Sequence, residues 1–358
     1  MPWRRGALAE VPEHMDALTS SLPLTLAALL LAGGVVLVAG LALTARAERL
    51  AKITGLGQAI LGAVFLGAAT SLSGTVTSVA AAWAGEAELA YGNAIGCIAV
   101  QTTFLVVADL VYRGVNLEHA AASEQNLLQG VLLVVLLALA QLAMFGPGIT
   151  LLGVDVLSFA LVIMYIFGVR LISAAQQQPM WHPRRTRHTA ATDTTALTPA
   201  AAGEAGRLWL SFIALALLVA GAGWVIAETG VALAERTGLS KTLVGTVLTS
   251  AITSTPELVV AVAAVRRGAL TLAVGDILGG NGFDVLFLVL SDIAYRAGSI
   301  HQAVSDKQAF WLALNALLVG VLLLGLLRRQ RHGMGNIGFE GVLVLGGYVA
   351  GVAMIIAG

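Results

Sequence analysis

An internal repeat constrains this chain more than any other feature. A shift of 183 residues, which carries Gly62 onto Gly245, aligns the two halves without a gap. Between Gly62 and Tyr112 it leaves 19 of 51 positions identical, including Thr70 and Ser71 with their equivalents Thr253 and Ser254. Two unrelated apolar segments of this length would share only about five or six residues by composition. One structural unit therefore occurs twice, and any fold must build two related halves.

The repeated units consist of long apolar runs. The 358 residues are 58% hydrophobic and only 11% charged, whereas a soluble domain carries about 25% charged residues. Apolar runs of about 20 residues span the hydrocarbon core of a bilayer as helices. Ten such runs are expected, at residues 22–45, 57–83, 87–112, 125–145, 149–173, 206–229, 240–265, 269–295, 308–327 and 337–357.

Each copy holds five expected spans, and an odd number places the second copy upside down relative to the first. The predicted fold class is all-α: a polytopic membrane protein of ten transmembrane helices, arranged as two inverted five-helix repeats. Inverted repeats of this kind are typical of secondary transporters. The predicted regions are an N-terminal segment 1–21, a first membrane region 22–173, a cytoplasmic linker 174–206 and a second membrane region 207–358.

The distribution of basic residues predicts the orientation. With the N-terminus outside, 14 of the 20 Lys and Arg residues lie on the inner side. This bias favours both termini outside and the linker in the cytoplasm. Compact size and short loops indicate an integral protein of a bacterial plasma membrane. The expected partners are the lipid bilayer and inorganic cations. The zero net charge gives no indication of nucleic acid, the single cysteine, Cys97, excludes an internal disulfide, and no oligomeric state is indicated.

The second copy carries ionisable residues deep in two spans. Glu257 follows Pro256 in the segment TSTPE, and Asp284 ends the segment GDILGGNGFD. Charged groups inside a membrane are costly and usually functional. The proline removes a backbone donor and is expected to break the helix, which would free carbonyl oxygens beside the hydroxyls of Thr253 and Ser254. Oxygen ligands of this kind suit a hard cation such as Ca²⁺ or Na⁺.

The first copy differs at the corresponding positions. Gly74 stands at the position equivalent to Glu257, and Gln101 at the position equivalent to Asp284. The hydroxyls of Thr70 and Ser71 are kept. The candidate cation ligands are therefore hydroxyl, amide and carboxylate groups drawn unequally from the two copies: Thr70, Ser71, Gln101, Thr253, Ser254, Glu257 and Asp284.

These motifs resemble the alpha repeats of the cation/calcium exchanger superfamily, which includes the sodium/calcium exchangers. The resemblance covers essentially the whole chain, with a specific match in the second copy and a degenerate first copy. It implies a Ca²⁺/Na⁺ or Ca²⁺/cation antiporter that works by alternating access, with a site near the midplane between helices 2, 3, 7 and 8. It also implies that helices 1 and 6 slide past that core, and that Gly74, Cys97 and Gly280 line the site.

The missing first-copy glutamate leaves the cargo open, because two carboxylates neutralise a divalent ion less well than three. One alternative is a monovalent cation or proton antiporter that uses Glu257 and Asp284. Another is a homologue that has lost transport together with the glutamate. An enzyme is not expected, because no histidine falls at metal-ligand spacing with a deep carboxylate. No cofactor is expected either: Ca²⁺, Na⁺ or H⁺ would be the substrate.

Overall fold

The computed structural model describes residues 18–54, 67–112, 114–121, 123–177, 184, 202–333 and 337–357. Most of the N-terminal segment, most of the linker and the first part of the span expected at 57–83 lie outside the described residues. Within them, eight helices are long and apolar enough to cross a membrane, or nine if the bent pair Lys241–Thr253 and Thr255–Arg266 forms one span.

The first half contains helices α2 (Leu22–Thr54), α4 (Leu72–Trp83), α5 (Ala87–Val111), α6 (Leu117–Ala121), α7 (Glu124–Phe145) and α8 (Val156–Gln177). A short hairpin of β1 (Thr150–Leu151) and β2 (Val154–Asp155) precedes α8. The span expected at 149–173 therefore begins later than predicted, because residues 150–155 pair as strands.

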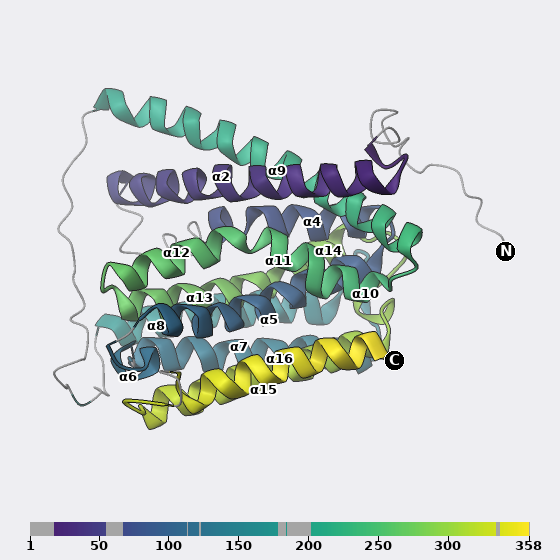
Figure 1. Ribbon diagram of the computed structural model, residues 1–358. Helices are drawn as coiled ribbons and strands as arrows, with labels where there is room; N and C mark the ends of the chain where they lie inside the picture. The colour runs from purple at the N-terminus through teal and green to yellow at the C-terminus, as the bar shows by residue number, and fades with distance from the viewer. Residues whose placement is uncertain are drawn as a thin grey trace.

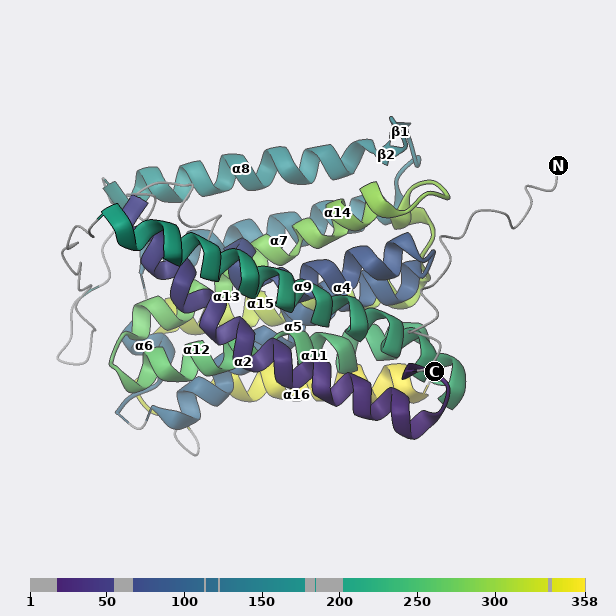
Figure 2. The same cartoon turned by 90° about the horizontal axis from the view of Figure 1, so that it is seen from above.

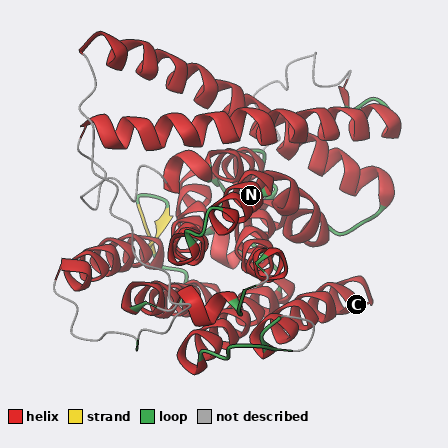
Figure 3. Ribbon diagram, turned by 60° about the vertical axis from the view of Figure 1, so that its left-hand side comes forward, coloured by secondary structure: helices red, strands yellow, loops and turns green. Residues whose placement is uncertain are grey.

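The second half contains helices α9 (Ala202–Thr237), α10 (Lys241–Leu243), the π-helical turn η2 (Val244–Thr249), α11 (Ser250–Thr253), α12 (Thr255–Arg266), α13 (Leu270–Asp284), α14 (Leu286–Ala294), the 3₁₀ turn η3 (Ile300–Gln302), α15 (Asp306–Arg328) and α16 (Phe339–Ala357). Helices α2 and α9 pack along one side of the bundle, with α15 and α16 on the opposite side (Figure 1). Figure 3 shows the same separation from another direction.

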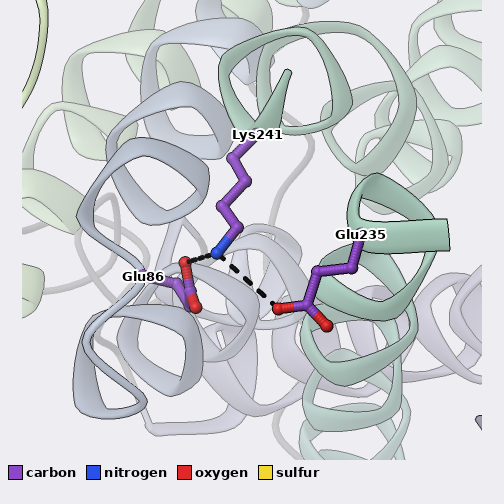
Figure 4. A network of polar contacts seen from close by, with 3 residues as sticks. All are labelled: Glu86, Glu235 and Lys241. Carbon is purple, nitrogen blue, oxygen red and sulfur yellow. Dashed lines mark hydrogen bonds and ion pairs between the residues drawn. The ribbon is translucent and has the colours of Figure 1, made fainter. Parts of the chain in front are cut away.

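The helices define two ends of the bundle. Helix α2 begins and α16 ends on one side, which we call the terminal face (Figure 1). Helix α8 ends and α9 begins on the other side, which we call the linker face (Figure 2). On the terminal face, Lys241 Nζ lies 2.5 Å from Glu86 Oε2 and 3.9 Å from Glu235 Oε1 (Figure 4). This network ties the start of α10 to the α4–α5 turn and to the end of α9.

Helix α5 forms the centre of the bundle. In its most apolar window 78% of the residues are buried, against 28% for α8, α9 and α16. Small residues allow η2 to approach it closely: a Cβ atom at Gly245 would lie 2.7 Å from the Leu89 carbonyl oxygen, and one at Gly96 would collide with the backbone of Thr246. Close approach of this kind is the usual role of glycine at membrane helix interfaces. The outer helices instead expose leucine, isoleucine and valine side chains to their surroundings.

Both copies break a helix at the same place. Ser71 and Ser254 have nearly identical backbone angles, φ −89° and ψ 12° against φ −92° and ψ 5°. The second break bends the helix by 47°. The prediction that Pro256 causes the break is incomplete, because the first copy turns at Ser71 with Ser73 at the position of the proline. The proline at the start of α12 fits the break, but the break does not require it.

The contacts that surround the breaks also occur twice. A Cβ atom at Gly40 of α2 would lie 2.9 Å from Pro256 Cγ, and one at Gly223 of α9 would lie 2.7 Å from the Ser73 carbonyl oxygen. Gly40 and Gly223 are equivalent positions, as are Ser73 and Pro256. Helices α2 and α9 thus touch the core at the two breaks in the same manner.

An aspartate anchors the loop after the central helix in each copy. Asp109 accepts a hydrogen bond from the Leu117 amide at 2.6 Å, and its equivalent Asp292 accepts one from the Ile300 amide at 2.9 Å. The second oxygen of each aspartate accepts a hydrogen bond from a backbone amide of the other copy. Gly338 donates to Asp109 at 3.3 Å, and Asp155 donates to Asp292 at 2.7 Å. These buried, charge-assisted hydrogen bonds connect the two copies at both faces.

The residues next to these anchors differ between the copies. On the terminal face His301 lies between Tyr91 Oη at 3.2 Å and Ser158 Oγ at 2.9 Å. On the linker face the equivalent residue is Glu118, which is buried and faces Glu340. We call Asp109, Glu118 and Glu340 the carboxylate cluster. Burial, together with the charges of its two acidic neighbours, raises the pKa of Glu118 well above its usual range.

Candidate cation site

The two copies meet at Gln101 and Asp284, which are equivalent positions on α5 and α13. Gln101 Nε2 donates to Asp284 Oδ2 at 2.8 Å and lies 3.3 Å from Ser254 Oγ. A residue that touches its own repeat equivalent lies where the two copies face one another. The contact therefore places an amide of the first copy beside a carboxylate of the second.

The other residues expected at the site surround this contact. Ser71 lies beside Asp284. Glu257 begins α12 and is close enough to Asp284 for their charges to repel. Thr253 Oγ1 lies 3.5 Å from Cys97 Sγ. The Thr70 hydroxyl donates to the Gly67 carbonyl at 3.0 Å within its own turn, as the Thr253 hydroxyl does to the Ser250 carbonyl at 3.2 Å.

The site contains buried oxygen atoms that lack a hydrogen-bond partner. Within the described part of the chain these include Gln101 Oε1 and Glu257 Oε2, while the Ser71 hydroxyl lies close enough to Asp284 to be its donor. Glu257 is 6% exposed and Asp284 is fully buried. Neither carboxylate forms an ion pair with a lysine or arginine among the described residues. Buried polar atoms are normally satisfied and buried charges are normally paired, so two carboxylates beside such oxygens suit a ligand that supplies positive charge.

The broken helices leave fewer carbonyls available than the sequence suggests. The Thr253 carbonyl, next to the break, accepts from Ser73 Oγ at 3.1 Å. The Ile252 carbonyl, which the proline deprives of its helical partner, accepts from Thr255 Oγ1 at 2.8 Å. Each carbonyl keeps a second lone pair, so either can still contact a cation. The hydroxyls and carboxylates, however, are the freer oxygens of the site.

The space beside Gly74, the first-copy position that lacks a glutamate, is occupied by other side chains. A Cβ atom at Gly74 would lie 2.8 Å from Phe287 Cε2 and 3.5 Å from Cys97 Sγ. Phe287 is 1% exposed, and its ring packs edge to face with Phe283. An aromatic ring of the second copy therefore occupies the space beside Gly74, the position equivalent to Glu257. The sequence alone did not indicate this, because Phe287 is identical to its equivalent Phe104 and looks like a repeat core residue.

Asn93 is a further polar residue that the sequence did not single out as a site residue. Its Nδ2 donates to the Gly74 carbonyl at 3.1 Å and to Ser78 Oγ at 2.9 Å, and its Oδ1 accepts from Thr249 Oγ1 at 2.8 Å. All of its hydrogen-bonding groups are engaged, so Asn93 connects α4, α5 and the η2 segment. Its role here is to position the helices that surround the site.

The chain is similar to known proteins over most of its length. The model of the sodium/calcium exchanger protein family matches residues 24–173 and 207–357. Among curated relatives, the chain is 27% identical over 287 residues to CaxA of Alkalimonas amylolytica, which is named as an antiporter; the match covers 79% of this chain and 85% of CaxA. It is 25% identical over 317 residues to the inner membrane protein YrbG of Escherichia coli K12, and this match covers 86% of this chain and 90% of YrbG.

Solved structures share the fold at low sequence identity. The crystal structure of the H⁺/Ca²⁺ exchanger CAX superimposes with a TM-score of 0.68 at 15% identity, covering 96% of this chain and 91% of that one. A structure of the sodium-calcium exchanger NCX_Mj superimposes with a TM-score of 0.58 at 17% identity, covering 93% and 99%.

Proposed function

Because the chain belongs to the sodium/calcium exchanger family and is an integral membrane protein, we propose that it exchanges Ca²⁺ for Na⁺ or another cation by alternating access. The cation would bind near the membrane midplane between α4, α5, α11–α12 and α13, at Ser71, Gln101, Thr253, Ser254, Glu257 and Asp284, with Thr70 contributing from the first break. The observation that carries this proposal is the pair of buried carboxylates, Glu257 and Asp284, which lie close to one another and have no lysine or arginine partner among the described residues.

The proposed architecture is ten spans in two inverted copies, with membrane regions 22–173 and 207–358 joined by a cytoplasmic linker. The contact between Gln101 and Asp284, 183 residues apart, supports a two-fold relation between the copies. The duplicated contacts of Gly40 and Gly223 support it too. Both termini would lie outside a bacterial inner membrane, as the excess of Lys and Arg at the linker face favours. Since the family consists of exchangers, transport rather than catalysis is expected.

The decisive experiment measures flux with the purified protein in liposomes. An outward Na⁺ or H⁺ gradient should drive Ca²⁺ uptake. Glu257→Gln and Asp284→Asn should each lower it at least about tenfold, because each removes a buried charge that the cation requires. Glu228→Gln is the matched control: Glu228 is half-buried on α9, outside the site, so its variant should transport normally.

A second function is an antiport of monovalent cations or protons through Glu257 and Asp284. The observation that favours it is the Phe287 ring, which fills the space that a third carboxylate would need. Calcium-independent exchange of Na⁺ or K⁺ for H⁺, lost in Glu257→Gln, would replace the first proposal with this one. If no Ca²⁺, Na⁺, K⁺ or H⁺ gradient drives flux and Glu257→Gln behaves as wild type, the protein does not transport these ions.

A further inference from the structure

A cavity opens between α2 and α9 at the linker face, away from the candidate cation site. Its volume is about 430 Å³, and it is lined by three arginines, one serine and three apolar residues: Ala45, Arg46, Arg49, Ile53, Arg207, Leu208 and Ser211. The two helices pack closely toward the terminal face and diverge toward the linker face (Figure 1). The cavity occupies this divergence.

The positive charge of the cavity comes from both helices. Arg46 and Arg49 are three residues apart and so share one face of α2, and Arg207 comes from the first turns of α9. Arg46 is half-buried, with its Nη1 3.3 Å from the Ala42 carbonyl, whereas Arg49 and Arg207 are exposed. Guanidinium groups that converge from two elements bind phosphate well.

Apolar residues also line the cavity and border it. Ile53 and Leu208 contribute to its lining. Beside it on α9, Trp209 is 37% exposed and Leu210 is 70% exposed, so the adjoining surface suits hydrocarbon. Tryptophan commonly lies at the level of the lipid headgroups. A ligand that satisfies both the arginines and this surface carries an anionic phosphate and apolar chains.

The opposite end of the same helix pair does not repeat these three arginines at the equivalent positions. The positions equivalent to Arg46, Arg49 and Arg207 are Thr229, Ala232 and Leu24. A crevice between α2 and α9 alone therefore does not account for the three arginines. An excess of basic residues at the linker face explains positive charge there, but not its convergence on one cavity from two helices.

We propose that this cavity binds the phosphate headgroup of an anionic phospholipid, with the acyl chains along the outer surface of α2 and α9. The bound lipid bridges the two helices that contact the core at Gly40 and Gly223. If α2 and α9 slide during transport, the lipid composition of the linker-side leaflet modulates that motion. The binding itself does not depend on which cation is transported, or on whether any is.

Native mass spectrometry of the detergent-purified full chain tests the proposal with phosphatidylglycerol and phosphatidylcholine as probes. Wild type should retain phosphatidylglycerol in preference to phosphatidylcholine. The variant Arg46→Gln/Arg49→Gln/Arg207→Gln should bind phosphatidylglycerol at least about tenfold more weakly, since each basic group at an anionic surface contributes roughly fivefold. Gel filtration checks that the variant folds, and Arg207→Gln alone should still give a measurable loss.

The matched control removes three arginines at the same face but outside the cavity: Arg266→Gln/Arg267→Gln/Arg328→Gln. These side chains are exposed, and the control should retain phosphatidylglycerol as wild type does. An equal loss in both triple variants would show general surface charge and overturn the proposal. Displacement of the lipid by inorganic phosphate at similar concentration would also overturn it, because the site would then recognise a soluble anion without its apolar chains.

Discussion

Alanine at the two glycines that face the helix breaks is the sharpest test of how α2 and α9 contact the core. The added Cβ of Gly223→Ala would lie 2.7 Å from the Ser73 carbonyl oxygen, where ordinary contacts begin at 3.4 Å. Helix α9 has to move away by that difference, because a backbone carbonyl cannot turn aside. The movement strains a second interaction, since Thr77 Oγ1 donates to the Gly223 carbonyl at 2.9 Å.

The expected cost follows from these two contacts. Overpacking a core costs about 1–3 kcal/mol, and weakening one buried hydrogen bond costs about 1 kcal/mol, so Gly223→Ala should lose about 2–4 kcal/mol of unfolding free energy. Gly40→Ala should lose about 1–2 kcal/mol, because its Cβ meets the edge of the Pro256 ring at 2.9 Å and a side-chain ring yields more easily. Both variants should also lower gradient-driven flux, if α2 and α9 move against the breaks.

Two glycines of the same helices serve as matched controls. A Cβ atom at Gly34 of α2 or at Gly221 of α9 would meet no atom within 4 Å. Alanine there should be neutral or should stabilise the helix by about 0.5–1 kcal/mol. Denaturant unfolding in detergent gives the stabilities, and liposome uptake gives the flux. If Gly223→Ala is as stable and as active as Gly221→Ala, α9 does not approach the Ser73 carbonyl at the first break closely enough for a Cβ atom to collide with it.

Three further predictions concern the asymmetry of the copies. Glu118→Gln should unfold at a higher temperature than wild type at about pH 8 but not at about pH 5. The raised pKa of Glu118 keeps a proton on the folded carboxylate cluster, whereas the unfolded chain releases it above the ordinary pKa of a glutamate. Wild type therefore loses stability as pH rises, and the variant does not. Gly74→Glu should lose about 1–3 kcal/mol of stability against the Phe287 ring, and Gly74→Glu/Phe287→Leu should recover it and raise Ca²⁺ uptake above Phe287→Leu alone. Thr77→Val should lose about 1 kcal/mol with the hydrogen bond to Gly223.

The outcomes that contradict these predictions are equally definite. A Glu118→Gln variant whose stability changes with pH as that of wild type does would mean that Glu118 is ionised in the folded protein. Stable folding of Gly74→Glu without the second substitution would show that Phe287 moves freely. If Thr77→Val loses no unfolding free energy, water replaces the hydroxyl at the α9 contact.

The repeat predicted much of the helical fold. Gln101 touches Asp284, its own repeat equivalent, as expected of residues that lie where two copies face one another. The break at Ser71 was missed because the sequence signal for a break was proline, while the cause is a backbone turn that both copies share. Thr70, predicted at the site from its equivalence to Thr253, donates its hydroxyl to the Gly67 carbonyl, and its place at the site stays a prediction.

Features that depend on tertiary packing could not be predicted. The Phe287 ring opposite Gly74 lies 213 positions away in sequence, and periodicity does not indicate which side chain enters an empty position. The arginine cavity depends on the angle at which α2 and α9 diverge. In the sequence its arginines are indistinguishable from ordinary inside-positive charge. Hydrophobic patterning predicts which residues are buried, but not which buried residues meet across helices.

An inverted repeat with two identical copies would give inward-open and outward-open states of equal energy. Each copy would adopt in one state the conformation that the other copy adopts in the other state. Every difference between equivalent positions removes that equality. Thr77 donates to Gly223 in one copy, but its equivalent Val260 has no hydroxyl with which to hold Gly40. If the two copies exchange these contacts between the states, the hydrogen bond exists in only one arrangement and favours it by about 1 kcal/mol, a population ratio of about five. Since an anionic lipid between α2 and α9 acts at one face only, it biases the same equilibrium. On this reasoning the divergence of the copies sets the resting state as well as the cargo.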